Sequence, residues 1–193
     1  LAKNVPSSRD EIRKKNGFLA VSSILFALGI IIDSVFAFTS ILAGTANADN
    51  FGSVVIEAVF GVFAAIYIMI FGISHFDGRT TYFQYRFLAL APLAWTTGRI
   101  IIRFMKKISY INVADLMLEI FILAAMMIFF LAFARISSGL SNEKSMRSLF
   151  SAGYVCIFFC ALANIPRIVL SVTGNGKYIP YEYPLSFCDL TFA

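Results

Sequence analysis

Charged and amide side chains recur within the apolar stretches of this sequence, and their chemistry is its most informative feature. An ionised side chain costs roughly 2.5–3.5 kcal/mol in hydrocarbon, so such residues normally face protein and are paired or functional. Carboxylates can bind cations or protons, whereas a guanidinium binds anionic groups. The residues in question are Asp33, Glu57, Arg99, Arg103, Asp115, Glu119, Asn164, Arg167 and Asp189.

Five of these residues form the predicted ligand-binding group. They come from different apolar runs, yet most fall about six to eight residues from the same end of their run, or roughly 9–12 Å deep at 1.5 Å rise per residue. Small or polar residues flank several of them at helical spacing, as helix contacts in lipid favour. We expect one outward-facing polar cavity for a small polar solute or ion, lined by Asp33, Glu57, Asn164, Arg167 and Asp189.

The other four charged residues predict two structural ion pairs. A short turn near residues 109–110 should make the flanking runs antiparallel neighbours. In a hairpin centred there, Arg103 faces Asp115 and Arg99 faces Glu119, with both arginines and both acids four residues apart. Buried pairs of this kind can fix helix packing with little net gain in stability.

Motifs for other chemistry are missing from the sequence. It has no Gly-rich phosphate loop, His-rich metal motif, nucleophile elbow or kinase signature, and His75 is its single histidine. We therefore expect no enzymatic activity, no cofactor and no metal site. Cys156 and Cys160 lie four residues apart in an apolar run, so we interpret them as small buried hydrophobic residues rather than as a disulfide.

The composition indicates an integral membrane protein. Apolar residues make up 59% of the 193 residues and charged residues 14%, against roughly 45–50% and about 25% in soluble domains. A globule of this size could not bury so much apolar surface, which argues against a soluble enzyme, a disordered tail or a secreted disulfide scaffold. The net charge of +5 does not predict nucleic-acid binding, because the basic residues lie in short segments between apolar runs.

The apolar runs predict the fold. We expect an all-α, polytopic transmembrane helical bundle with five complete spans and the start of a sixth, because roughly 20 apolar residues cross a bilayer. Residues 1–16 form a predicted cytoplasmic amphipathic segment and residues 17–193 the bundle, truncated in helix six of a longer protein. The predicted spans are Gly17–Gly44, Phe51–His75, Tyr82–Met105, Ile111–Arg135 and Leu149–Gly174, with the sixth beginning near Tyr181.

The distribution of Lys and Arg predicts the topology. With the N-terminus in the cytoplasm, ten basic residues lie inside and four outside, as the positive-inside rule favours. The predicted outer loop of residues 45–50 has no basic residue, although Lys106 and Lys107 fall on the outer side. We expect a multi-pass protein of the plasma (inner) membrane, with the polar cavity in its outer half.

In size, helix count and outward-facing polar layer, the chain resembles the substrate-binding subunits of energy-coupling-factor vitamin transporters. Those subunits dock a membrane partner through small residues on helix one, to which Ala20, Ser23 and Ala27 are similar. The resemblance is architectural and implies solute binding and a membrane partner subunit. Two other functions stay open: a sensor or receptor module, and a structural subunit of a larger membrane complex.

Overall fold

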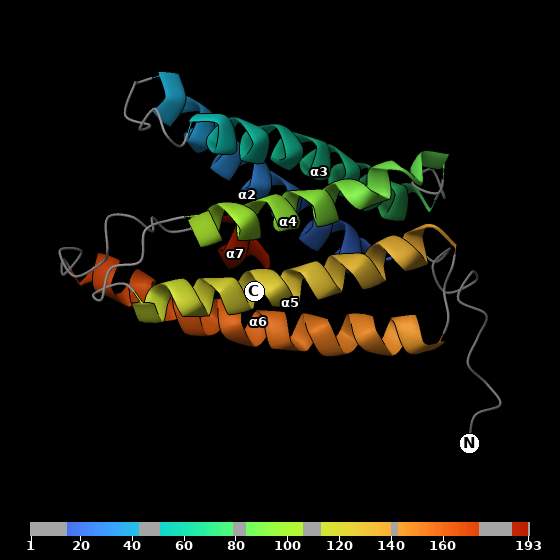
Figure 1. Cartoon of the computed structure of the whole chain (residues 1–193). Coiled ribbons are helices and arrows are strands. Elements are labelled where there is room, and N and C mark those ends of the chain that lie inside the picture. The colour runs from blue at the N-terminus through green and yellow to red at the C-terminus, as the bar shows by residue number, and fades with distance from the viewer. Residues whose placement is uncertain are drawn as a thin grey trace.

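The described part of the chain is all-α. The computed structural model describes residues 15–42, 51–78, 84–105, 113–139, 143–173 and 187–192, so most of the predicted N-terminal segment lies outside the described residues. The helices are α2 (Gly17–Leu42), α3 (Phe51–Asp77), α4 (Ala91–Met105), α5 (Val113–Ser137), α6 (Glu143–Val172) and α7 (Phe187–Phe192), with a 3₁₀ turn at Leu88–Leu90 (Figure 1).

Four helices are long and apolar enough to cross a membrane. They are α2, α3, α5 and α6, with candidate spans Gly17–Thr39, Val54–Asp77, Leu116–Ser137 and Lys144–Leu170. At 1.5 Å rise, spans of 22 to 27 residues are roughly 33–40 Å long, enough for about 30 Å of hydrocarbon. Large apolar side chains such as Phe18, Phe36 and Phe158 are exposed on these helices, as expected where they face lipid. The chain is a multi-pass membrane protein.

The prediction of five complete spans is wrong at the third helix. In place of a helix over residues 82–105, α4 begins at Ala91 and has 15 residues, which corresponds to roughly 22 Å. The polar residues Gln84 and Arg86 interrupt the apolar pattern just before it. Pro92 then lies in the first turn of α4, the helical position where its missing N–H costs no hydrogen bond.

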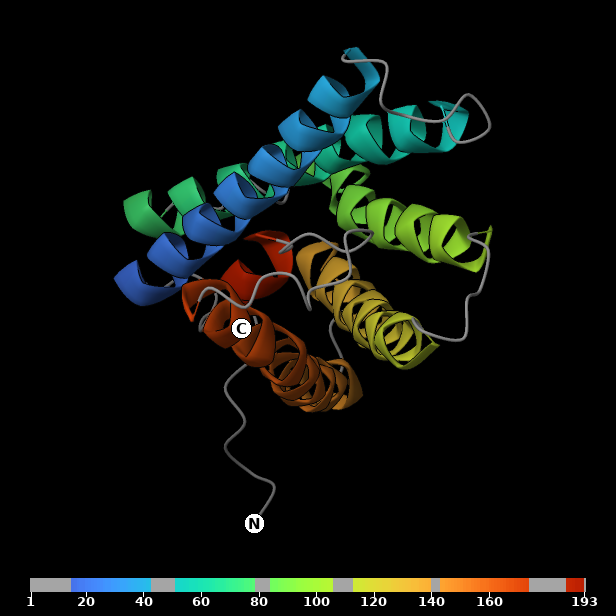
Figure 2. The same ribbon diagram turned by 90° about the vertical axis from the view of Figure 1, so that its left-hand side faces the viewer.

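The helices from α2 to α6, with α4 included, alternate in direction along the chain (Figure 1). We call the end of the bundle where α2 begins the Lys15 end, and the end where α2 finishes the Leu42 end (Figure 1). Viewed along the bundle, the short α7 lies in its middle, between α2 and the α5–α6 pair (Figure 2). The ring of Phe192 on α7 contacts Phe26, Phe129 and Phe130, with centroids 5.2, 5.1 and 6.4 Å apart.

Small residues let α2 and α3 approach closely. A Cβ placed on Gly72 would lie 3.2 Å from the carbonyl oxygen of Ala20 and 3.3 Å from the Cβ of Ser23, and Gly61 meets Ser34 in a similar way. Ala20 and Ala27 are fully buried. The transporter resemblance assigns small residues of this helix to partner docking. Two of them, Ala20 and Ser23, instead pack against α3 in the structure.

Candidate functional site

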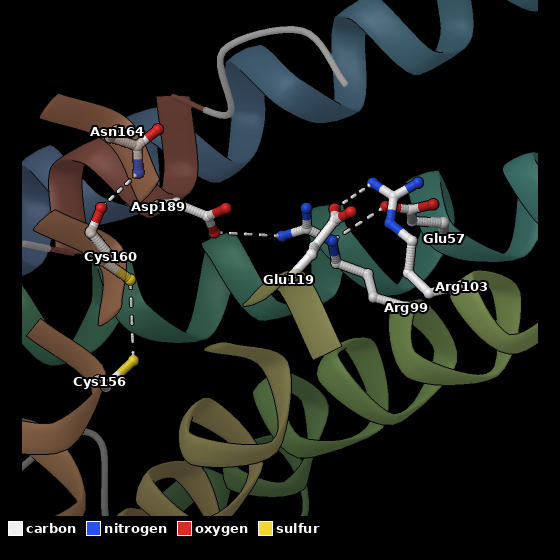
Figure 3. Close-up of polar contacts among 8 residues, drawn as sticks. All are labelled: Glu57, Arg99, Arg103, Glu119, Cys156, Cys160, Asn164 and Asp189. Carbon is white, nitrogen blue, oxygen red and sulfur yellow. Dashed lines mark hydrogen bonds and ion pairs between the residues drawn. The ribbon is translucent and has the colours of Figure 1, made fainter. Parts of the chain in front are cut away.

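Five ionisable side chains from four helices lie together toward the Leu42 end. Figure 3 shows Glu57 of α3, Arg99 and Arg103 of α4, Glu119 of α5 and Asp189 of α7 converging between the ribbons. We call these five residues the charged cluster. Each residue lies in a helix, so the backbone fixes the position of its side chain along the bundle.

Arg99 is at the centre of the charged cluster. Its Nε lies 3.2 Å from Oε1 of Glu57, and its Nη1 lies 3.7 Å from Oδ1 of Asp189. Its guanidinium carbon also lies 5.0 Å from the centroid of the Trp95 ring, a cation–π distance. Arg99 and Asp189 are each 5% exposed, so both charges are removed from water and depend on each other.

A second ion pair connects α4 and α5. Nη2 of Arg103 lies 2.7 Å from Oε1 of Glu119, a charge-assisted hydrogen-bond distance. This contact places Glu119 opposite Arg103, whereas the hairpin register predicted Asp115 there and Glu119 opposite Arg99. The side chain of Asp115 lies outside the described side chains.

The charged cluster contains three carboxylates and two guanidiniums. When all five groups are ionised it has a net charge of −1, in a site where Glu119 and Asp189 are nearly inaccessible to solvent. The second carboxylate oxygen of Glu119, Oε2, is buried and has no hydrogen-bond partner among the described residues. A buried carboxylate oxygen left in this way is costly unless a hydrogen-bond donor, a water molecule, a proton or a cation reaches it.

The structure brings together two of the five residues predicted to bind a ligand. Glu57 and Asp189 meet through Arg99, which the sequence interpretation had assigned to packing. Asn164 is buried on α6 and donates its side-chain N–H to the carbonyl oxygen of Cys160, 3.0 Å away (Figure 3). Its amide is thus used within α6, which continues as a helix through Pro166.

The remaining two predicted residues lie on other helices of the bundle. Asp33 is half-buried on α2, next to Ser34, which packs against Gly61. Arg167 is half-buried on α6 and forms no ion pair with any residue of the described ranges. Arg99, and not Arg167, contacts both Glu57 and Asp189.

Two features of the site went unrecognised in the sequence. Trp95 and Arg99 are four residues apart on α4, the spacing that places a ring beneath a guanidinium on one helical face, so this signal was available. The contact between Arg99 and Asp189 had no such signal.

In the described residues no three His, Cys, Asp or Glu side chains form a group suited to a metal ion. Cys156 and Cys160 are buried, as predicted, with their Sγ atoms 3.9 Å apart and no disulfide between them.

Comparison with known proteins adds no relationship: no family model, curated protein sequence or solved structure matches this chain.

Proposed function

We propose that this protein binds, and moves across the membrane, a small cationic solute or ion at the charged cluster. The observation that carries the proposal is the excess of carboxylates: among the described residues of the cluster three acids face two arginines, and the five side chains come from four helices. A purely structural set of ion pairs needs no uncompensated acid, whereas a cation site does.

The electrostatics of the charged cluster favour a cation or a proton over an anion. Arg99 already contacts both Glu57 and Asp189, and Arg103 contacts one oxygen of Glu119. Oε2 of Glu119 remains as a buried acceptor in a site with net charge −1. In a medium of low dielectric constant, a bound cation or proton would cancel this charge and recover part of the desolvation cost.

The side chains of the charged cluster come from four different helices, which supports a role in transport. A cation at the charged cluster would contact side chains from α3, α4, α5 and α7, so its binding free energy would depend on how these helices are placed. A ligand that binds two helix arrangements with different affinity shifts the population between them, which is the requirement for alternating access. With the N-terminus in the cytoplasm, the cluster would face the outer half of the bilayer.

The test measures cation-dependent stability of the reconstituted protein. We expect the melting temperature to rise saturably with Na⁺, K⁺, choline or protons, because a ligand that binds only the folded state at 100 times its Kd stabilises it by about 2.7 kcal/mol. Glu119→Gln should abolish this rise. Asp77→Asn, which alters an exposed acid outside the charged cluster, is the matched control and should keep it. If none of the four cations shifts the parent protein, or if both variants respond alike, the proposal is wrong.

One observation favours a structural subunit as the second candidate. The 2.7 Å contact between Arg103 and Glu119 joins neighbouring helices and is the kind of pair that fixes helix packing. In that case Glu119→Gln would lower stability equally at all cation concentrations. The substitution would remove a packing contact, and there would be no cation site for it to affect.

A further inference from the structure

The negative charge of the charged cluster is not spread evenly over its ion pairs. Arg103 and Glu119 form one pair of opposite charges, with Nη2 and Oε1 2.7 Å apart. Arg99 instead faces two carboxylates, Glu57 at 3.2 Å and Asp189 at 3.7 Å (Figure 3). Among the described residues of the cluster, the excess negative charge therefore belongs to the two acids that share Arg99.

The two acids that share Arg99 differ in their exposure to solvent and in their distance from the guanidinium. The side chain of Glu57 is 24% exposed and that of Asp189 is 7% exposed. Asp189 also lies farther from Arg99 than Glu57 does, at 3.7 Å against 3.2 Å. Burial disfavours an ionised carboxyl group, and an opposite charge offsets this cost most at short distance. Asp189 is therefore the acid of the two that gains more from a proton.

The groups on the surrounding helices act on Asp189 in both directions. The helix that carries it, α7, packs against α2 and α6, and the charged cluster lies beside it. Apart from Arg99, the titratable or charged groups with described side chains in this half of the bundle are Asp33 of α2, Glu57 of α3, Arg103 of α4, Glu119 of α5, and Cys160 and Arg167 of α6. Arg167 would oppose a proton on Asp189. An ionised Asp33 and the buried Oε2 of Glu119, which has no hydrogen-bond partner among the described residues, would favour it.

A proton suits this group better than a metal ion or an organic cation does. Hard metal ions such as Ca²⁺ and Mg²⁺ are bound by about six or more oxygen atoms, and no three His, Cys, Asp or Glu side chains of the described ranges form a group that could hold one. An organic cation would need the face of an aromatic ring, and the guanidinium carbon of Arg99 already lies 5.0 Å from the centroid of Trp95. A proton needs one carboxylate oxygen and no cavity.

We propose that the ion bound at the charged cluster is a proton taken up from water by Asp189, and that this proton weakens the contact between α7 and α4. The inference rests on the proposed function, of which it specifies the ion. With Asp189 neutral, the cluster holds two carboxylates and two guanidiniums, so its charges cancel. Arg99 keeps Glu57 and loses its Coulomb attraction to Asp189. Proton binding is thereby coupled to the placement of a helix, as transport requires.

The experiment follows the infrared C=O band of protonated carboxyl groups, with the full chain in lipid nanodiscs. Between about pH 9 and about pH 6, ordinary Asp and Glu side chains stay ionised, so a band that appears on acidification reports a perturbed acid. We expect such a band, and we expect it to shift when aspartate is labelled with ¹³C at its side-chain carboxyl carbon. Asp189→Glu should keep the band and abolish its response to the aspartate label. Asp33→Asn, which alters the half-buried acid of α2, should change neither.

Unfolding of the same samples gives a second measurement. Because the folded protein would bind a proton that the unfolded chain does not, the folding equilibrium constant should rise as the pH falls through the range in which the band appears, by up to about tenfold per pH unit. Asp189→Asn should remove this part of the pH dependence. Asp77→Asn, at an exposed acid outside the charged cluster, is the matched control and should retain it.

The outcomes separate this inference from the proposed function. A band that ignores the aspartate label, or that disappears in Asp33→Asn, places the proton on another acid and overturns the inference. A pH dependence that persists in Asp189→Asn does the same. If no band appears while Na⁺, K⁺ or choline raises the melting temperature, cation binding stands and the ion is not a proton. If no band appears and no cation has an effect, the inference and the proposed function fail together.

Discussion

Arg99 of α4 and Asp189 of α7 lie with Nη1 and Oδ1 3.7 Å apart, although 90 positions separate them in the sequence. This contact attaches the short α7 to the rest of the charged cluster. Glu57 reaches the same guanidinium from α3, at 3.2 Å. One arginine thus holds acids from two other helices, which makes it the residue on which the cluster depends most.

Removal of Arg99 should destabilise the fold strongly. Arg99→Gln leaves Glu57 and Asp189 without their guanidinium partner, and breaking a buried pair on one side costs about 3–5 kcal/mol. Denaturation in mixed micelles measures the loss. Arg135→Gln, at an exposed arginine of α5, is the control and should cost less than about 0.5 kcal/mol. Adding Asp189→Asn to Arg99→Gln should recover part of the stability; no recovery would show that the two side chains are not coupled.

The contact between Arg103 and Glu119 should appear in a double-mutant cycle. Arg103→Met and Glu119→Gln each leave one partner alone, so the double variant should be more stable than the sum of the single effects predicts, by about 0.5–3 kcal/mol. The parallel cycle of Arg103→Met with Asp115→Asn tests the register predicted from the hairpin. A larger coupling for Asp115 than for Glu119 would contradict the observed pairing.

Gly72→Ala and Gly98→Ala should change stability in opposite directions. Both glycines are helical, and alanine is favoured over glycine within a helix by about 1 kcal/mol. At Gly98 the new methyl group meets open space, so the protein should gain up to that amount. At Gly72 it meets the Ala20 carbonyl at 3.2 Å and Ile24 at 2.9 Å, so α2 must move away and the protein should lose about 1–3 kcal/mol. Equal gains at both positions would contradict the close approach of α2 and α3.

Phe192→Ala should release α7 from the bundle. The ring contacts Phe26 and Phe129 at centroid distances near 5 Å. Within a membrane the cost comes from lost packing, and for this half-buried ring we expect about 2 kcal/mol, below the roughly 3–5 kcal/mol of a fully buried phenylalanine. Phe18→Ala, at a ring that is 86% exposed, is the control and should have little effect in the same denaturation assay. Equal losses for the two variants would show that α7 does not depend on Phe192.

The orientation in the membrane is tested by labelling. We expect a cysteine introduced at Ala46, in the predicted outer loop of residues 45–50, to react with an impermeant maleimide added to intact cells, because the excess of basic residues predicts a cytoplasmic N-terminus. Replacing Cys188 by serine removes a background thiol, while Cys156 and Cys160 are buried. Reaction only after permeabilisation would reverse the orientation and place the charged cluster in the inner half of the bilayer.

Local sequence was sufficient for four membrane helices and for the positions of charged residues along them. Runs of apolar residues long enough to cross a bilayer predict α2, α3, α5 and α6, because lipid requires every backbone group to bond within its own helix. The same reasoning failed for α4. The polar residues before Pro92 shorten this helix to 15 residues. A hydropathy value averaged over the whole apolar run conceals this interruption.

Which charges meet was decided by the tertiary structure. Spacing along one hairpin could place the two arginines of α4 on one face, but it did not decide that Glu119 contacts Arg103. The position of α7 in the middle of the bundle depends on packing around Phe192, and nothing local to residues 187–192 encodes it. Sequence by itself therefore determined that charged residues lie within the apolar helices, because hydropathy and helical period are local properties. Only the fold decided that Arg99 joins Glu57 to Asp189, because that contact depends on how separate helices pack.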